Sequence, residues 1–159
     1  MINKDSNYFI EKLKMEPHIE GGYFKETFLS EDKDSNDKNL YSSIYFLLRT
    51  GEVSNFHRLK EDELWYFHAG QSLTIYMINE KGDLITKKLG LNIEAGEEPQ
   101  VLVKKGWIFG SAMNEDGYAL VGCMVAPAFS YNSFELFDRE YLLKTYPKHK
   151  EVILKLTRE

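Results

Sequence analysis

The sequence predicts a mainly β fold, a sandwich or barrel of short strands with helices only at the two ends of the chain. From residue 40 to residue 126, short segments rich in β-branched and aromatic residues follow one another, and turn sequences separate them. No segment in this region has helical spacing, whereas both ends of the chain do. The length of 159 residues suits a single domain, residues 1–159.

The first forty residues predict one helix, one strand and one loop. Ser6 can cap a helix over residues 7–15, and Pro17 would end it. Residues 21–30, GGYFKETFLS, follow with the pattern of a strand. Residues 31–39 contain no apolar side chain and predict a solvated loop.

The remaining segments predict the body of the barrel and a helical end. The predicted strands span residues 40–50, 54–59, 63–69, 72–79, 84–90, 99–105, 107–112 and 118–126. Residues 137–147 and 149–157 instead have apolar spacing near three and four, which predicts two short helices broken at Pro147. The expected architecture is therefore one β domain with helical ends.

Composition narrows the class of partner and compartment. The net charge is −5 and the basic residues are spread along the chain, so we expect no nucleic-acid partner. The first 17 residues have no apolar signal core, and no run approaches a membrane span, so a cytoplasmic protein without a membrane partner is expected. The single cysteine, Cys123, lies in an apolar run, which suits a buried core residue in a reducing compartment.

One stretch, SNFHRLKEDELWYFHAG at residues 54–70, carries the candidate chemistry. If it folds as a hairpin about Lys60, His57 faces Glu63 on its more aromatic face, which we place inward. Such a pair can act as a general base with an orienting acid, and it can also supply two metal ligands. A structural pair in which the two groups only satisfy each other is equally open.

The other face of this hairpin predicts structure rather than chemistry. Arg58 would face Asp62 as an ion pair. Leu64 and Tyr66 would be exposed apolar residues there, which predicts a subunit interface and hence a homodimer.

The same residues resemble the cupin superfamily. His57-x-Leu59, Glu63 and Gly70 are similar to the first cupin motif, HxH, three or four residues, Glu, six residues, Gly. Residues 104–109, KKGWIF, stand where the second motif has Pro-x-Gly-x-x-His. Matching stretches from about residue 20 to residue 157, such as EGGYFKETF and YALVGCMVAPAFSYNSFEL, resemble the cupin 5 branch, domain of unknown function 985.

This resemblance implies a single cupin domain, a double-stranded β-helix or jelly roll that often pairs as a dimer. It also implies a sugar-epimerase-like protein in a family whose reaction is not established in general. Leu59 and Phe109 replace two of the three histidines of the usual metal site, and only His57 and Glu63 remain. We therefore expect no cofactor, and keep open a divalent metal on His57 and Glu63, with Gln100 as a substitute ligand.

A second resemblance concerns the predicted N-terminal strand. Residues 22–28, GYFKETF, are similar to the RGxFxExF stretch of nucleotide-sugar epimerases that use this barrel without metal, but Gly21 replaces the arginine. The resemblance implies that His57 removes a proton next to a keto group and that Glu63 orients it. A tyrosine would return the proton, with Tyr45 and Tyr131 as candidates.

Three functions follow as hypotheses. The preferred one is a metal-independent isomerase or epimerase acting on a small carbohydrate-like carbonyl compound. The alternatives are a cupin that binds a small ligand without reaction and a metal-dependent cupin with a reduced ligand set. The ligand-binding residues predicted to line the pocket are Trp65, Phe67, Gln100, Trp107, Phe109 and Tyr45.

Overall fold

The computed structural model describes residues 3–159, and within them twelve strands form two six-stranded sheets. The first sheet has the order β1-β2-β3-β11-β5-β9, and the second has the order β12-β4-β10-β6-β7-β8. The strands of the first sheet are β1 (Glu16–Pro17), β2 (Tyr23–Leu29), β3 (Ser42–Arg49), β5 (Asp62–Gly70), β9 (Gln100–Val103) and β11 (Tyr118–Ala126). Those of the second are β4 (Val53–Arg58), β6 (Leu73–Ile78), β7 (Leu84–Leu89), β8 (Glu97–Glu98), β10 (Ile108–Met113) and β12 (Glu135–Leu136). This is the predicted jelly roll.

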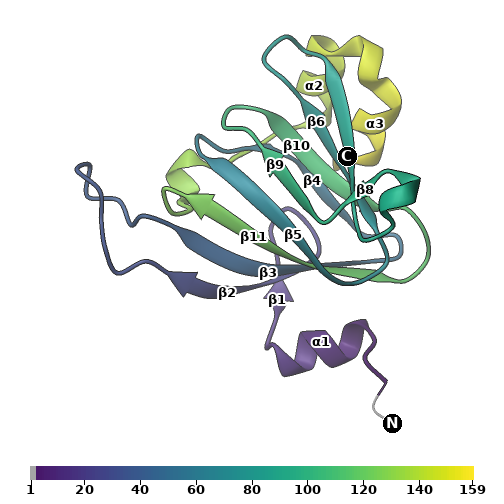
Figure 1. Cartoon of the computed structure of the whole chain (residues 1–159). Coiled ribbons are helices and arrows are strands. Elements are labelled where there is room, and N and C mark those ends of the chain that lie inside the picture. Colours follow the sequence, from purple (N-terminus) through teal and green to yellow (C-terminus); the bar gives the residue numbers. More distant parts are fainter. Residues whose placement is uncertain (1–2) are drawn as a thin grey trace.

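The helices lie at the two ends of the chain, as predicted, and each end covers the outer face of a different sheet (Figure 1). Helix α1 (Ser6–Lys12) packs beside Leu47 and Leu120 of the first sheet. Helices α2 (Arg139–Thr145) and α3 (Lys150–Lys155) form a second cluster with Phe56 and Ile108 of the second sheet. Pro147 starts the short 3₁₀ turn, Pro147–His149, that separates α2 from α3.

Two details of the N-terminal prediction are corrected. The side chain of Asp5, rather than that of Ser6, caps α1 by accepting the backbone N–H of Tyr8 at 2.9 Å. The helix ends at Lys12, short of Pro17. Asp5 and Ser6 are both residue types that cap helices well, so sequence alone cannot fix the boundary to one position.

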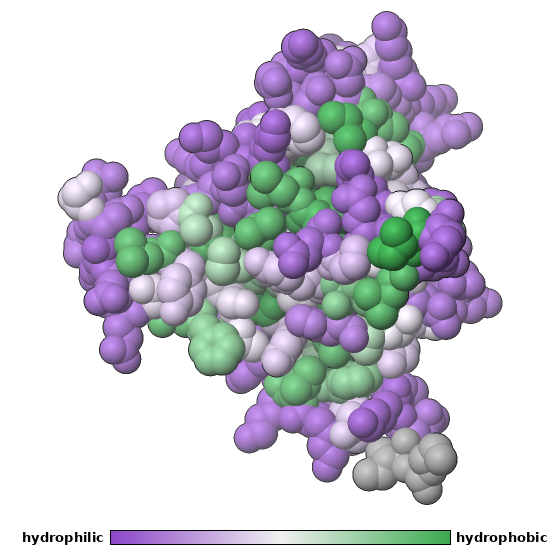
Figure 2. Space-filling model, in the orientation of Figure 1, coloured by the Kyte–Doolittle hydropathy of each residue, from purple (hydrophilic) through white to green (hydrophobic). Residues whose placement is uncertain are grey.

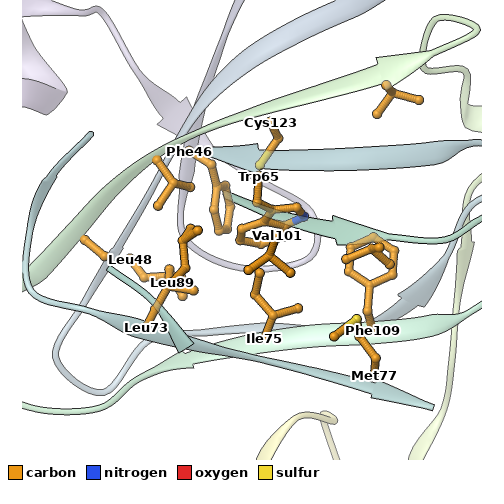
Figure 3. Close-up of a cluster of buried hydrophobic side chains, with 14 of the residues drawn as sticks. Phe46, Leu48, Trp65, Leu73, Ile75, Met77, Leu89, Val101, Phe109 and Cys123 are labelled. Atoms are coloured by element: carbon orange, nitrogen blue, oxygen red, sulfur yellow. The ribbon is translucent and has the colours of Figure 1, made fainter. Parts of the chain in front are cut away.

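The main core lies between the two sheets. In Figure 3, Phe46, Trp65 and Cys123 of the first sheet point toward Leu73, Ile75 and Met77 of the second. On the outside, apolar side chains reach the surface mainly over the middle of the face in Figure 2, while the loop between β2 and β3 is hydrophilic. A cavity lies where polar side chains enter the space between the sheets.

The predicted hairpin about Lys60 is wrong, because β4 and β5 belong to different sheets. Strand β4 pairs with β10 and β12, whereas β5 pairs with β11 and β9. The segment between β4 and β5 is thus a corner that carries the chain from one sheet to the other. Short alternating strands joined by a polar turn have the same local pattern in both cases, and only long-range pairing separates them.

The predicted Arg58–Asp62 ion pair is wrong for the same reason. Arg58 instead pairs with Glu135 of β12, with 2.7 Å between its guanidinium and the carboxylate. Asp62 accepts the backbone N–H of Lys105 at 2.8 Å.

Candidate functional site

A cavity of about 190 Å³ lies between the two sheets and opens beside the loop that follows β11. Its polar lining comes from several separate elements, whose side chains meet only in the folded barrel. The residues that line it are His18, Glu20, Phe24, Glu26, Ser42, Ile44, His57, Leu59, Glu63, Cys123, Val125, Phe129, Tyr131 and Phe134. His57 and Glu63 therefore face one cavity, although they are not cross-strand neighbours.

His57 is held by hydrogen bonds at both ring nitrogens. Its Nδ1 lies 2.7 Å from the carbonyl oxygen of Asn55, and its Nε2 lies 2.9 Å from Oε2 of Glu20. The carbonyl oxygen of Asn55 can only accept, so Nδ1 carries a proton. The pKa of Glu20 is lowered, so its ionised carboxylate accepts from Nε2–H and the ring is an imidazolium. Burial alone would lower the pKa of His57, but the charge and hydrogen bond of Glu20 outweigh it and raise that pKa above its usual value.

Glu20, which was not among the predicted site residues, is the acid that contacts His57. Burial opposes the charge of this carboxylate, but the attraction of His57 holds the pKa of Glu20 below its usual range. Its other oxygen, Oε1, accepts the hydroxyl of Ser54 at 3.3 Å. In the sequence, Glu20 stands directly before the glycine pair of EGGYFKETF. The glycine pair predicts a turn there, but it does not predict where the Glu20 side chain points.

The backbone around Glu20 is fixed by the neighbouring strand. The carbonyl of Glu20 accepts the backbone N–H of Asn55 at 2.7 Å and its side-chain amide at 3.0 Å. Gly21 has φ of +115°, and a Cβ there would lie 1.9 Å from the carbonyl oxygen of Val53. Only glycine fits this conformation and this close approach, and it brings Glu20 beside β4.

His18 lies next to this pair as a neutral ring. Its Nδ1 accepts the backbone N–H of Glu20 at 3.1 Å, so that nitrogen carries no proton. Burial lowers the pKa of His18 further than Glu20 raises it. The site therefore holds one charged histidine and one neutral histidine.

Glu63 differs from Glu20 in its protonation. Its Oε2 accepts the indole N–H of Trp65 at 3.1 Å, and no described residue donates to its Oε1. Burial, assisted by the negative charge of Glu20, raises the pKa of Glu63 to about 8. At neutral pH Glu63 is a protonated acid with a free hydrogen-bonding oxygen in the cavity. Cys123 lies beside it, and burial raises the pKa of that thiol well above its ordinary value, which suits a core thiol and not a nucleophile.

The six side chains predicted to bind ligand do not line the cavity. Trp65 and Phe109 lie behind it: the Trp65 indole binds Glu63, and the Phe109 ring lies 4.1 Å from that of His57. Phe67 packs against the main core, and the Trp107 indole N–H donates to Glu80 at 2.7 Å.

Gln100 and Tyr45, the other two residues predicted to bind ligand, lie in other parts of the first sheet. Gln100 is exposed on the edge strand β9, and the Tyr45 ring lies 5.8 Å from that of His68 within the cluster beneath α1. The sequence prediction placed the aromatic wall on residues 65–67 and 107–109, but the wall comes mainly from the loop after β11. Phe129, Tyr131 and Phe134 of that loop pack edge to face, and Tyr131 is the predicted tyrosine that does line the cavity.

The metal donors of the usual cupin centre are not assembled here. Leu59 lines the cavity and Phe109 lies behind it, at the two positions where the motifs would place histidines. His57 already donates from both ring nitrogens. Across residues 3–159, the structure contains no group of three or more His, Cys, Asp or Glu side chains that could hold a metal ion. The residues present do not fit that centre.

The family description "Cupin superfamily (DUF985)" matches residues 7–137 of the chain. The chain belongs to this cupin family. A protein from Shewanella oneidensis with a known crystal structure is 58% identical to this chain in sequence. The two structures align with a TM-score of 0.95 over 98% of this chain and 99% of that one. A hypothetical protein from Leishmania major is 34% identical, with a TM-score of 0.90, over 98% of this cupin and 100% of its own length.

More distant structures show the fold alone. Oxalate decarboxylase from Bacillus subtilis is 20% identical, with a TM-score of 0.58, and 88% of this cupin matches 36% of that longer chain. Comparison with curated proteins gives no significant match. Among the described residues, no helix is both long and apolar enough to cross a membrane.

Proposed function

We propose that this cupin is an isomerase or epimerase that moves a proton at a carbon next to the carbonyl group of a small carbohydrate-like compound. One observation carries the proposal: two buried carboxyl groups, Glu20 and Glu63, face the same cavity with pKa values displaced in opposite directions. Such a divergence separates a proton acceptor from a proton donor within one site.

The proposed reaction uses this divergence directly. The ionised Glu20 carboxylate takes the proton from the carbon next to the carbonyl, while protonated Glu63 donates its proton to the carbonyl oxygen. The product of this step is a neutral enediol, and proton return to the neighbouring carbon or to the opposite face completes isomerisation or epimerisation. Concerted donation and removal avoids a free enolate charge in a buried cavity.

His57 acts as a positioning residue for Glu20 in this proposal. Both of its ring nitrogens already carry protons, so the role of base predicted for His57 passes to its carboxylate partner. The imidazolium keeps Glu20 ionised and fixes its orientation. Tyr131, which is 62% exposed at the mouth, stays a candidate for proton return.

The test is solvent exchange with a panel of neutral ketoses and aldoses in deuterated water, followed by NMR of the exchanged carbon. The wild-type protein should introduce deuterium next to the carbonyl, with a rate that falls as the pH rises through about 8, where Glu63 loses its proton. Glu63→Gln should slow exchange by on the order of 10²-fold or more. The exposed Glu94→Gln serves as the control that keeps the wild-type rate. Exchange at the wild-type rate in Glu63→Gln, or none with any compound, would refute the proposal.

A second function, binding without reaction, is favoured by the complete pairing of Glu20 and His57 with protein groups. Native mass spectrometry of untagged protein would separate the two. A compound retained at one per chain and unchanged after prolonged incubation supports a binding module. Metal analysis of the same sample tests the reduced ligand set, and an ion at one per chain would contradict the metal-independent proposal. The homodimer and the cytoplasmic location stay predictions.

A further inference from the structure

The cavity is acidic and has no basic counterpart. Three glutamates, Glu20, Glu26 and Glu63, line it together with two histidines, and no lysine or arginine among residues 3–159 does. The positive charge of His57 is already directed at Glu20, and His18 is neutral. An incoming anion would therefore find no free cation inside the cavity.

The mouth adds a negative charge. Glu26 is an exposed residue of β2 and takes part in none of the ion pairs found among the described residues. Since Glu20 and His57 offset each other and Glu63 is protonated, Glu26 leaves the lining with a net negative charge at neutral pH. Above pH 8 the ionisation of Glu63 increases this charge.

The size of the cavity also favours a small ligand. The cavity of about 190 Å³ is smaller than the 300–1,000 Å³ typical of drug-sized ligands. It suits a molecule on the scale of a single small sugar.

We propose that the cavity admits small neutral or positively charged molecules, such as free sugars and amino sugars, and excludes anions such as phosphate esters and nucleotide-linked sugars. An anion would lose hydration without gaining a charged partner and would meet a carboxylate at the entrance. As a statement about substrate class this rests on the proposed function, whereas the charge selectivity of the cavity can be tested without any reaction.

Cys123 supplies the test because it is the only cysteine of the chain and lines the cavity. The rates of its modification are measured with three methanethiosulfonates that carry a neutral, a positive and a negative group. Each rate is divided by the rate of the same reagent with free cysteine, which removes the intrinsic reactivity of the reagent. The raised pKa of the Cys123 thiol slows all three reagents alike, so it cancels from the ratio of any two of them. The corrected ratio of the positive to the negative reagent should exceed one by on the order of tenfold.

Two variants locate the charge responsible. Glu26→Gln should reduce this ratio severalfold, while Glu94→Gln, an exposed glutamate that does not line the cavity, should leave it unchanged. A corrected ratio of the positive to the negative reagent at or below one in the wild-type protein would overturn the inference. Selectivity without deuterium exchange would refute only the proposed reaction, and exchange without selectivity would refute only this inference.

Discussion

Replacement of Glu63 by glutamine tests whether the barrel really holds a protonated acid. Glutamine has nearly the same shape and keeps an oxygen that can accept the Trp65 indole N–H, so the variant removes the titration and little else. The pKa of the Glu63 carboxyl group is about 8 in the folded protein, compared with the ordinary value of 4.5 that we assign to the unfolded chain. Between those values the folded chain keeps a proton that the unfolded chain releases.

The magnitude follows from linkage. The stability supplied by protonated Glu63 is complete below the unfolded-state pKa and is lost as the pH rises toward about 8. Each pH unit inside this window costs about 1.4 kcal/mol, so the free energy of unfolding should fall by about 2.5 kcal/mol between pH 5 and pH 7 through this group alone. Glu63→Gln lacks this dependence, while every other titrating group is common to both proteins.

Urea denaturation followed by tryptophan fluorescence measures the effect at a series of pH values. The difference in unfolding free energy between Glu63→Gln and wild type should rise in favour of the variant by about 2.5 kcal/mol from pH 5 to pH 7 and level off above about pH 8. The exposed Glu94→Gln should track the wild type across the range. A difference that stays constant with pH would show that Glu63 is not held protonated, and the proposed proton donor would be lost with it.

Three further substitutions test how the site is held together. Gly21→Ala places a Cβ 1.9 Å from the carbonyl of Val53, so urea melts should show a loss of about 2 kcal/mol or more, and a wild-type midpoint would contradict the strain. Glu20→Gln removes the negative charge that keeps His57 protonated, so ¹⁵N NMR of the His57 ring should show a neutral imidazole at pH 7. An unchanged spectrum would mean that the charge of Glu20 is not what keeps His57 protonated. Phe109→Ala removes a buried ring against His57 and should cost about 3–5 kcal/mol in the same melts; a loss below about 1 kcal/mol would mean that the ring contributes little to the core.

Much of the fold could be predicted because its signals are local. The alternating segments between residues 40 and 126 correspond to strands, and the helical spacing within residues 137–157 corresponds to α2 and α3. The motif around His57 and Glu63, together with matching stretches from about residue 20 to residue 157, indicated the family that the comparison then showed. These features depend on a few consecutive residues, so one sequence is enough to indicate them.

The pairing of strands could not be predicted in the same way. A polar corner and a hairpin turn contain the same residue types, so the chain around Lys60 predicted that His57 and Glu63 face each other across a strand pair. In the structure their strands lie in opposite sheets, and the side chains approach one cavity from two sides. The aromatic wall of the cavity was also misplaced, because Phe129 and Phe134 follow β11 and are far from His57 and Glu63 in the sequence.

The sequence by itself determined the class of fold, the family and two polar groups that enter the barrel. Only the tertiary structure decided what those groups do to each other. Glu20 reaches His57 from 37 positions away because a glycine turn packs against β4, and this contact sets the charges of both side chains. The pKa of a side chain depends on its burial and on charges close to it in space, and the neighbouring residues in the sequence determine neither of these.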